Sequence, residues 1–270
     1  MTELLPGLTT DVDILVFGQY VVGAFAAYWS IFLLTYFLPI NPGDAKPLNP
    51  KTTCRRSIAF ANRCAAISHA IAEMVIATYM IHKYFRYDST RLFLPINWDA
   101  PLQGDAHYIC ALVVGYCFAD GLYLVLFEYD FLMFAHHVAV VIGILPCQLA
   151  PYGFLIATTS TWVAEVTNPV QNVWQYGRDF GPKQMYQAMS GLFTYSFAIC
   201  RGIIMPVLLL DYYVFLFLEV REGLGMWLWL LRLSVIIFTI GWFGSLMWLK
   251  GVILGYWRYL EKKKAKKEKA

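Results

Sequence analysis

Long apolar segments recur along the whole chain, and proline, glycine or charged residues close each of them. A helix that crosses a bilayer needs about 18 or more apolar residues, and these segments are near or above that length. The pattern predicts seven spans: Ile14–Leu38, Ala59–Phe85, His107–Phe127, Phe131–Leu149, Gly153–Tyr176, Gln187–Phe217 and Met226–Leu249. We therefore expect an all-α polytopic membrane protein, with the sixth span tilted or kinked at Pro206.

The composition agrees with a membrane environment. Apolar residues make up 59% of the 270 residues and charged residues only 14%, against about 45–50% and 25% in a soluble domain. The polar surface is too small for a soluble protein of this size. Acidic residues precede the first span where a signal peptide carries basic ones, so this span is expected to stay as a helix. Residues 1–58 are expected to form this helix and a cytosolic loop, 59–255 the main helical domain, and 256–270 a basic cytosolic tail.

The basic residues predict the orientation, because Lys and Arg in short loops favour the cytosol. With seven spans, one side of the membrane receives Arg178, Lys183, the lysine-rich tail, and the loop residues Lys46, Lys51, Arg55 and Arg56. The N-terminus is then luminal or external and the C-terminus cytosolic. The tail lysines serve as a topology anchor or bind anionic lipid headgroups. No nucleic-acid partner is implied, and the oligomeric state stays open.

The cysteines predict neither a zinc site nor a redox motif. Six cysteines are scattered without a CxxC pair, so we expect no structural metal and no bound cofactor. Cys110 and Cys147 both fall near the luminal helix ends, where a disulfide is chemically possible. Two buried free thiols are the alternative.

Polar residues inside the spans are the candidate functional residues, because ionisable groups at membrane depth face the bundle interior, where they pair or act on a ligand. Span two has Asn62, His69 and Glu73 near one helix face. Span five has Glu165, Asn168 and Asn172 along another. The remaining candidates are Tyr116, Asp120 and Tyr123 in span three, His136 and His137 in span four, and Arg201 in span six.

The rise of about 1.5 Å per residue allows these groups to be matched by depth from the cytosolic end. His136 and Asp120 fall at roughly 8–10 Å, His69 and Glu165 at about 15–16 Å, and Glu73 and Arg201 at around 21 Å. The matches predict a chamber with an Arg201–Glu73 ion pair near a blind luminal end and the histidines nearer the cytosol. Hydrogen bonds that merely lock helices together are the alternative for each residue, at ~0.6–2 kcal/mol apiece.

The two adjacent histidines require separate roles. Consecutive residues point about 100° apart on a helix, so both rings cannot face one partner. We expect one imidazole to face the chamber while the other braces a neighbouring helix. A neutral imidazole in such a place can accept a proton or act as a nucleophile.

The ordered motifs "NRCAAISHA", "GYCFADGLYLVLF", "DFLMFAHHVAV", "VAEVTNP" with "QNVW", "FAICRGIIMP" and "SLMWLKG" resemble the TLC-domain proteins, from about Asn62 to Gly251. The resemblance is closest to the TLC-domain transmembrane proteins of poorly defined function. It implies an endoplasmic-reticulum protein with six helices around a lipid-accessible chamber. Its ceramide synthase branch implies acyl transfer from acyl-CoA by His136 and His137, with Asp120 as a partner that fixes the tautomer. Two positions depart from that branch: Val140 replaces a threonine, and "EVTNP" replaces an aspartate pair.

Three functions remain open at this stage. The first is lipid homeostasis through binding of a fatty acyl chain, sphingoid base or phospholipid in the chamber, lined by His69, Glu73, Glu165, Asn168, Asn172, Arg201, Tyr116 and Tyr123. The second is an acyl-CoA-dependent acyltransferase that uses His136, His137 and Asp120. The third is a transporter, although no inverted repeat or paired broken helices are evident.

Overall fold

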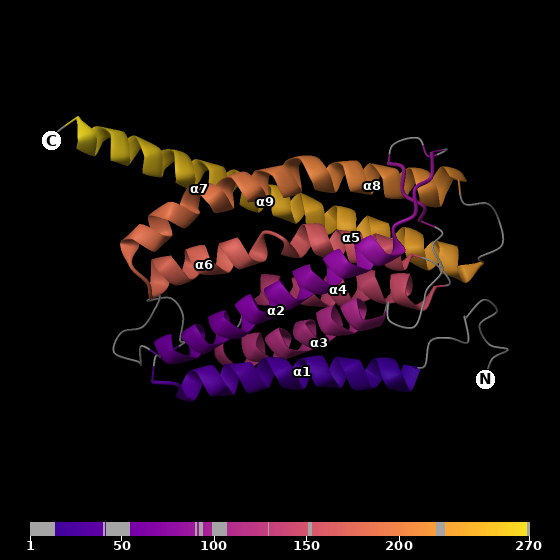
Figure 1. Cartoon of the computed structure of the whole chain (residues 1–270), viewed down its shortest axis with the longest axis horizontal. Helices are drawn as coiled ribbons and strands as arrows, with labels where there is room; N and C mark the ends of the chain where they lie inside the picture. Colours follow the sequence, from indigo (N-terminus) through magenta and orange to yellow (C-terminus); the bar gives the residue numbers. More distant parts are fainter. Residues whose placement is uncertain are drawn as a thin grey trace.

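A computed structural model describes residues 14–39, 41, 55–89, 91, 94–98, 107–128, 130–150, 153–219 and 225–268. Its helices run side by side along one long axis (Figure 1). Within these ranges they are α1 (Ile14–Phe37), α2 (Arg56–Tyr84), α3 (His107–Tyr123), α4 (Phe131–Leu149), α5 (Phe154–Glu165), α6 (Asn168–Asp179), α7 (Lys183–Ile199), α8 (Met205–Val214) and α9 (Met226–Lys267). Three π-helical turns continue these helices: η1 (Leu124–Glu128), η2 (Cys200–Ile204) and η3 (Phe215–Glu219).

Six of the predicted spans are continuous helical segments that are long and apolar enough to cross a membrane. The fifth is broken into α5 and α6, of 12 residues each, because Pro169 has no backbone N–H to continue the helical ladder. α1 begins at one end of the bundle and α9 finishes at the other (Figure 1). An odd number of crossings is therefore required, and α5 with α6 supplies the seventh.

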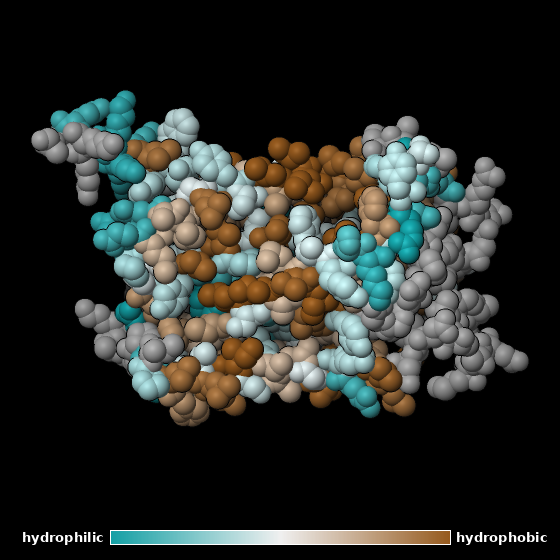
Figure 2. Space-filling view, in the orientation of Figure 1, coloured by the Kyte–Doolittle hydropathy of each residue, from teal (hydrophilic) through white to brown (hydrophobic). Residues whose placement is uncertain are grey.

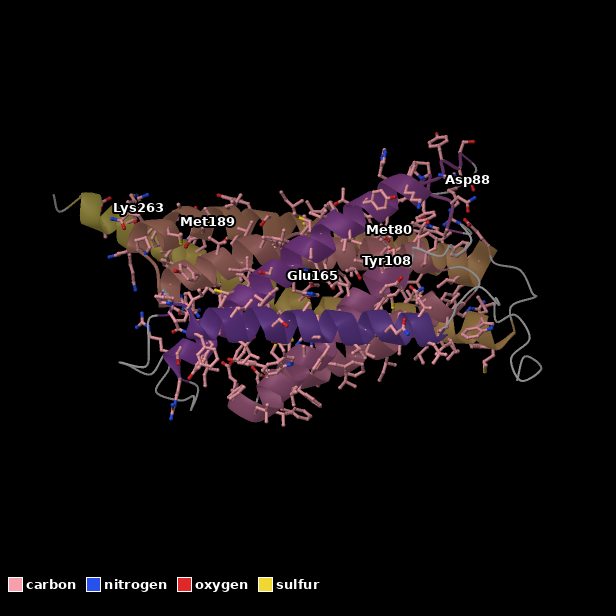
Figure 3. All side chains as sticks on the ribbon, turned by 60° about the horizontal axis from the view of Figure 1, so that its bottom comes forward. Met80, Asp88, Tyr108, Glu165, Met189 and Lys263 are labelled. Atoms are coloured by element: carbon pink, nitrogen blue, oxygen red, sulfur yellow. The ribbon has the colours of Figure 1, made fainter. Side chains whose placement is uncertain are left out.

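The surface has the polarity of a membrane protein. Hydrophobic residues cover the middle of the face shown in Figure 2, and hydrophilic ones gather toward its two ends. Asp88 and Lys263 mark these opposite ends, with Glu165 between them (Figure 3). We call them the cap end, at Asp88, and the tail end, at Lys263. The predicted all-α polytopic fold is confirmed.

The irregularity predicted at Pro206 takes the form of a π-helical turn. η2 comes directly before α8, in which Pro206 occupies the first turn. A wider turn rearranges the carbonyl groups that the proline cannot bond. Arg201 lies inside η2. Its side chain therefore points in a different direction from the one it would have in a regular α-helix.

At the cap end, described residues that follow α2 bind a buried aspartate on α8. Asp211 is fully buried and accepts hydrogen bonds from the Trp98 indole N–H at 2.6 Å and the Leu94 backbone N–H at 3.3 Å. The guanidinium of Arg91 lies 3.5 Å from the same carboxylate and also pairs with Glu219. Sequence reasoning missed Asp211, although an aspartate inside an apolar span is a visible signal.

α1 packs on the outside of the bundle, against α3 and α2. At Gly115 the two backbones come so close that a Cβ atom would lie 2.6 Å from both the Ala24 Cβ and the Val21 carbonyl oxygen. Small residues permit such close helix packing in membranes. The contact of α1 with α3 therefore depends on the absence of a side chain at residue 115.

Gly115→Ala is expected to destabilise the protein, whereas Gly244→Ala on α9, where a Cβ meets no atom within 4 Å, is expected to stabilise it. Overpacking costs about 1–3 kcal/mol, and alanine in an unobstructed helix gains about 0.5–1 kcal/mol over glycine. Thermal unfolding in detergent micelles measures both variants. Equal midpoints for the two would contradict the close packing of α1.

Candidate functional site

A cavity of about 210 Å³ lies inside the bundle, and every crossing except α1 contributes to its lining. The prediction of six helices around a central chamber is therefore confirmed. Five polar side chains of the lining, which we call the polar wall, are those of Glu73, His136, Glu165, Asn168 and Arg201. The rest of the lining is mainly apolar and includes Val113, Met133, Ile144, Met205, Ile237, Phe238 and Trp242.

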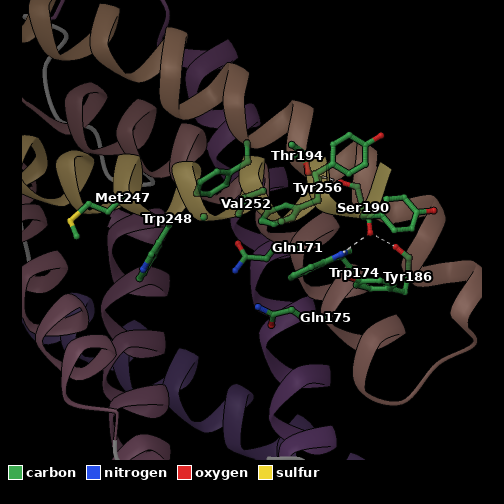
Figure 4. Close-up of a pocket in the computed structure, with 15 residues that line it drawn as sticks. Gln171, Trp174, Gln175, Tyr186, Ser190, Thr194, Met247, Trp248, Val252 and Tyr256 are labelled. Atoms are coloured by element: carbon green, nitrogen blue, oxygen red, sulfur yellow. Dashed lines mark hydrogen bonds between the residues drawn. The ribbon is translucent and has the colours of Figure 1, made fainter. Parts of the chain in front are cut away.

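A second hollow of about 420 Å³, which we call the tail groove, adjoins the cavity toward the tail end between α6, α7 and α9 (Figure 4). The cavity and the tail groove share Gln171, Phe197 and Trp248 in their linings. In the groove the Trp174 indole N–H donates to the Ser190 hydroxyl at 3.0 Å. The groove thus has aromatic and polar lining groups and lies beside the cavity.

The two histidines of α4 have different environments, as their spacing predicts. The Nε2 atom of His137 lies 2.7 Å from an Asp120 carboxylate oxygen, and both side chains are buried. His136 lines the cavity, with its ring centroid 5.7 Å from that of His137 and 6.3 Å from that of Trp248. The depth match of His136 with Asp120 was wrong, because residues one step apart differ little in depth but by about 100° in direction.

Asp120 connects four helices. Its second carboxylate oxygen accepts from the Tyr28 hydroxyl of α1 at 3.1 Å, and that hydroxyl also contacts the Asn62 side-chain oxygen of α2. Sequence reasoning missed Tyr28, since a tyrosine in an apolar span carries no distinguishing signal. The pair of His137 and Asp120 thus braces the helices behind the cavity wall.

A second polar cluster joins α2 to α5. The Nε2 atom of His69 lies 3.0 Å from a Glu73 carboxylate oxygen, one turn along α2. The His69 ring stacks on Tyr116, with centroids 3.6 Å apart. Donor atoms of His69, Glu73 and Glu165 all lie within 4.8 Å of one another, so the depth match of His69 with Glu165 is confirmed.

The predicted Arg201–Glu73 ion pair does not occur among the described residues. Arg201 instead donates to the Ala164 carbonyl at 2.8 Å. The break after α5 explains this partner, because carbonyls in the last turn of a helix have no intrahelical donor. The Glu73 carboxylate instead contacts the imidazole of its neighbour His69. Arg201 and Glu73 still share the polar wall.

Four predicted chamber residues do not line the cavity. His69 and Tyr116 lie directly behind the polar wall. Tyr123 packs against Phe32 of α1 and donates to Glu128 at 3.2 Å. The side-chain oxygen of Asn172 accepts a hydrogen bond at 3.1 Å from the guanidinium of Arg63, which is on α2. The side chain of Asn172 on α6 points in a different direction from that of Glu165, because the helix is broken between the two residues.

The cysteines form no disulfide among the described residues. Cys110 and Cys147 are both free and buried in the hydrophobic core toward the cap end. Of the two alternatives, a disulfide or two buried free thiols, the structure has the free thiols.

The helices and the polar-walled cavity define a polytopic all-α membrane protein with an intramembrane pocket. The model of the TLC-domain family matches residues 59–253, so the chain belongs to that family. The match includes the cavity-lining helices and leaves out α1. No curated protein and no solved structure match the chain.

His137→Ala and Asp120→Ala are each expected to lower the free energy of unfolding by about 1–3 kcal/mol, because each leaves a buried polar partner unsatisfied. The loss of unfolding free energy in the double variant is expected to be smaller than the sum of the two single losses by at least about 1 kcal/mol. Unfolding by SDS titration measures the cycle. His136→Ala is the control, with an expected change within about 0.5 kcal/mol; additive losses would show that the pair is not coupled.

Proposed function

We propose that this TLC-domain protein binds a membrane lipid in its intramembrane cavity and acts in sphingolipid or phospholipid homeostasis. The observation that carries the proposal is a mainly apolar cavity whose lining includes the polar wall and shares three residues with the tail groove. Ligand pockets are mostly apolar and contain a few placed polar groups, which fix the orientation of the ligand. This division matches a lipid, with an acyl chain along the apolar lining and its polar group at the wall.

The polar wall contains groups of both charges. The carboxyl groups of Glu73 and Glu165 can bind an amine, as in a sphingoid base, and Arg201 can bind a carboxylate or phosphate. Fatty acyl, sphingoid and phospholipid ligands therefore all stay within the proposal. The tail groove offers the route by which such a ligand enters.

We also propose that the tail end faces the cytosol of the endoplasmic reticulum membrane. The starts of α2 and α7, with Arg55, Arg56 and Lys183, lie at the same end as the tail lysines of α9 (Figure 1). This distribution agrees with the positive-inside rule. A groove at that end would open to lipids of the cytosolic leaflet.

Gly241→Phe is expected to reduce the lipid retained by the purified protein by at least about fivefold, because a phenyl ring occupies a pocket of this size. Gly241 lines the cavity, and a Cβ there meets no atom within 4 Å. Gly244→Phe, also on α9 and unobstructed but outside the cavity lining, is the matched control. Native mass spectrometry counts the bound lipid; equal retention by the two variants would contradict the proposal.

Acyl transfer is a second candidate, favoured by the accessible imidazole of His136 at the cavity wall. A neutral imidazole there can take the proton of an attacking amine or hydroxyl, or accept the acyl group itself. His137, which is bonded to Asp120, would position α4 and therefore the ring of His136. Acyl-CoA is the co-substrate that this reaction requires: its thioester C–S bond breaks, and coenzyme A leaves as a thiol after taking up the proton from the imidazolium.

Incubation with labelled acyl-CoA and a panel of amine and hydroxyl lipids tests this candidate. If transfer occurs, His136→Ala is expected to lower the rate by about 10²–10⁴-fold, the usual contribution of a positioned acid or base. His82→Ala, at the exposed end of α2, is the control. Absence of labelled product from the wild type would leave lipid binding as the function.

A further inference from the structure

Three metal-ligating side chains converge in the membrane interior. His69 and Glu73 come from successive turns of α2, and Glu165 comes from the last turn of α5. One donor atom of each lies within 4.8 Å of the others. Bonds of about 2.1 Å to a shared zinc ion would place such atoms about 3.4 Å apart. Ion binding would therefore require side-chain rotations that bring the donor atoms closer by up to about 1.4 Å.

Two of these donor atoms have no hydrogen-bond partner among the described residues and contact only each other. Nε2 of His69 and Oε1 of Glu73 are buried and make no hydrogen bond, although they lie 3.0 Å apart. The Glu73 side chain is only 1% exposed. Buried polar atoms without a partner are uncommon in folded proteins and call for a specific explanation. A cation held between them would satisfy both.

The surroundings of the cluster resemble the support that metal ligands require. Asn168 donates to one oxygen of Glu165 at 2.7 Å, and the stacked ring of Tyr116 fixes the plane of His69. Such contacts orient metal ligands. Glu73 and Glu165 also line the cavity, so an ion between them would keep one side open to a ligand.

Charge gives a further reason. Two carboxyl groups and one imidazole share a region from which the bilayer excludes water, and unpaired charges there are costly. The nearby cation, Arg201, is hydrogen-bonded to the Ala164 carbonyl. A divalent ion with a bound hydroxide or lipid anion, two carboxylates and this guanidinium would together be neutral.

We propose that His69, Glu73 and Glu165 bind one divalent cation of the zinc class, with an open coordination position toward the cavity. Imidazole nitrogen and carboxylate oxygen are both zinc ligands, and zinc sites with three protein ligands keep a fourth position open. The open position would bind the polar group of a lipid or a water molecule. The proposal goes beyond lipid binding and does not depend on it.

The full-length protein in detergent, stripped with a chelator and dialysed against Zn²⁺ or Co²⁺, is expected to retain one equivalent of ion. Cobalt in this site is expected to give visible absorption bands that zinc abolishes. Glu73→Gln, Glu165→Gln and His69→Ala are each expected to weaken binding at least about tenfold. His82→Ala and Glu261→Gln, which change exposed residues of the same types, are the controls.

Retention of ion by the wild type and both controls, with loss in the site variants, would support the site. No ion on the folded wild type would overturn the proposal, and so would ion retention that the three substitutions leave unchanged. The cobalt spectrum of the wild type keeps the test decisive if a variant fails to fold. Gly241→Phe is expected to keep the ion while it loses lipid, which separates this proposal from lipid binding.

Discussion

Asp120 is the group on which the packing around the cavity depends. A carboxylate inside a bilayer is costly unless neighbouring groups satisfy it, and this one has partners from α1 and α4. The bond to His137 fixes the rotation of α4 about its axis. Because the preceding residue then points about 100° away, His136 is directed to the cavity. The position of one accessible imidazole thus follows from a buried pair behind it.

The crossings could be predicted from the sequence because membrane thickness imposes their length. The predicted bounds of the fourth span, Phe131–Leu149, coincide with those of α4. The fifth span was predicted as one helix, since hydropathy does not register a break in hydrogen bonding. Pro169 was the available signal, because a proline inside a helix removes a backbone donor.

The site was predicted as a set of residues but only partly as a set of contacts. Depth along a helix is one coordinate, and the direction of a side chain is the other. Matching by depth correctly predicted that His69 and Glu165 lie together. It also paired Arg201 with Glu73, whereas in the structure Arg201 donates to a backbone carbonyl. Tyr28 could not be selected from sequence, because its role arises only from the partners that the fold brings to it. Arg63, an ionisable residue inside the second predicted span, was a visible signal that sequence reasoning missed.

The broken crossing explains why the polar groups gather where they do. A continuous fifth helix would bond its own carbonyls and leave Arg201 without this acceptor. The break exposes the last carbonyls of α5, and Arg201 in the π-helical turn satisfies one of them. It also places Glu165 and Asn168 at the two helix ends that meet beside the cavity. Irregular backbone at membrane depth is tolerated where it lines a cavity or is covered by protein. The polar wall and the break are therefore parts of one feature: the break frees backbone groups, and Arg201 of the wall satisfies one of them.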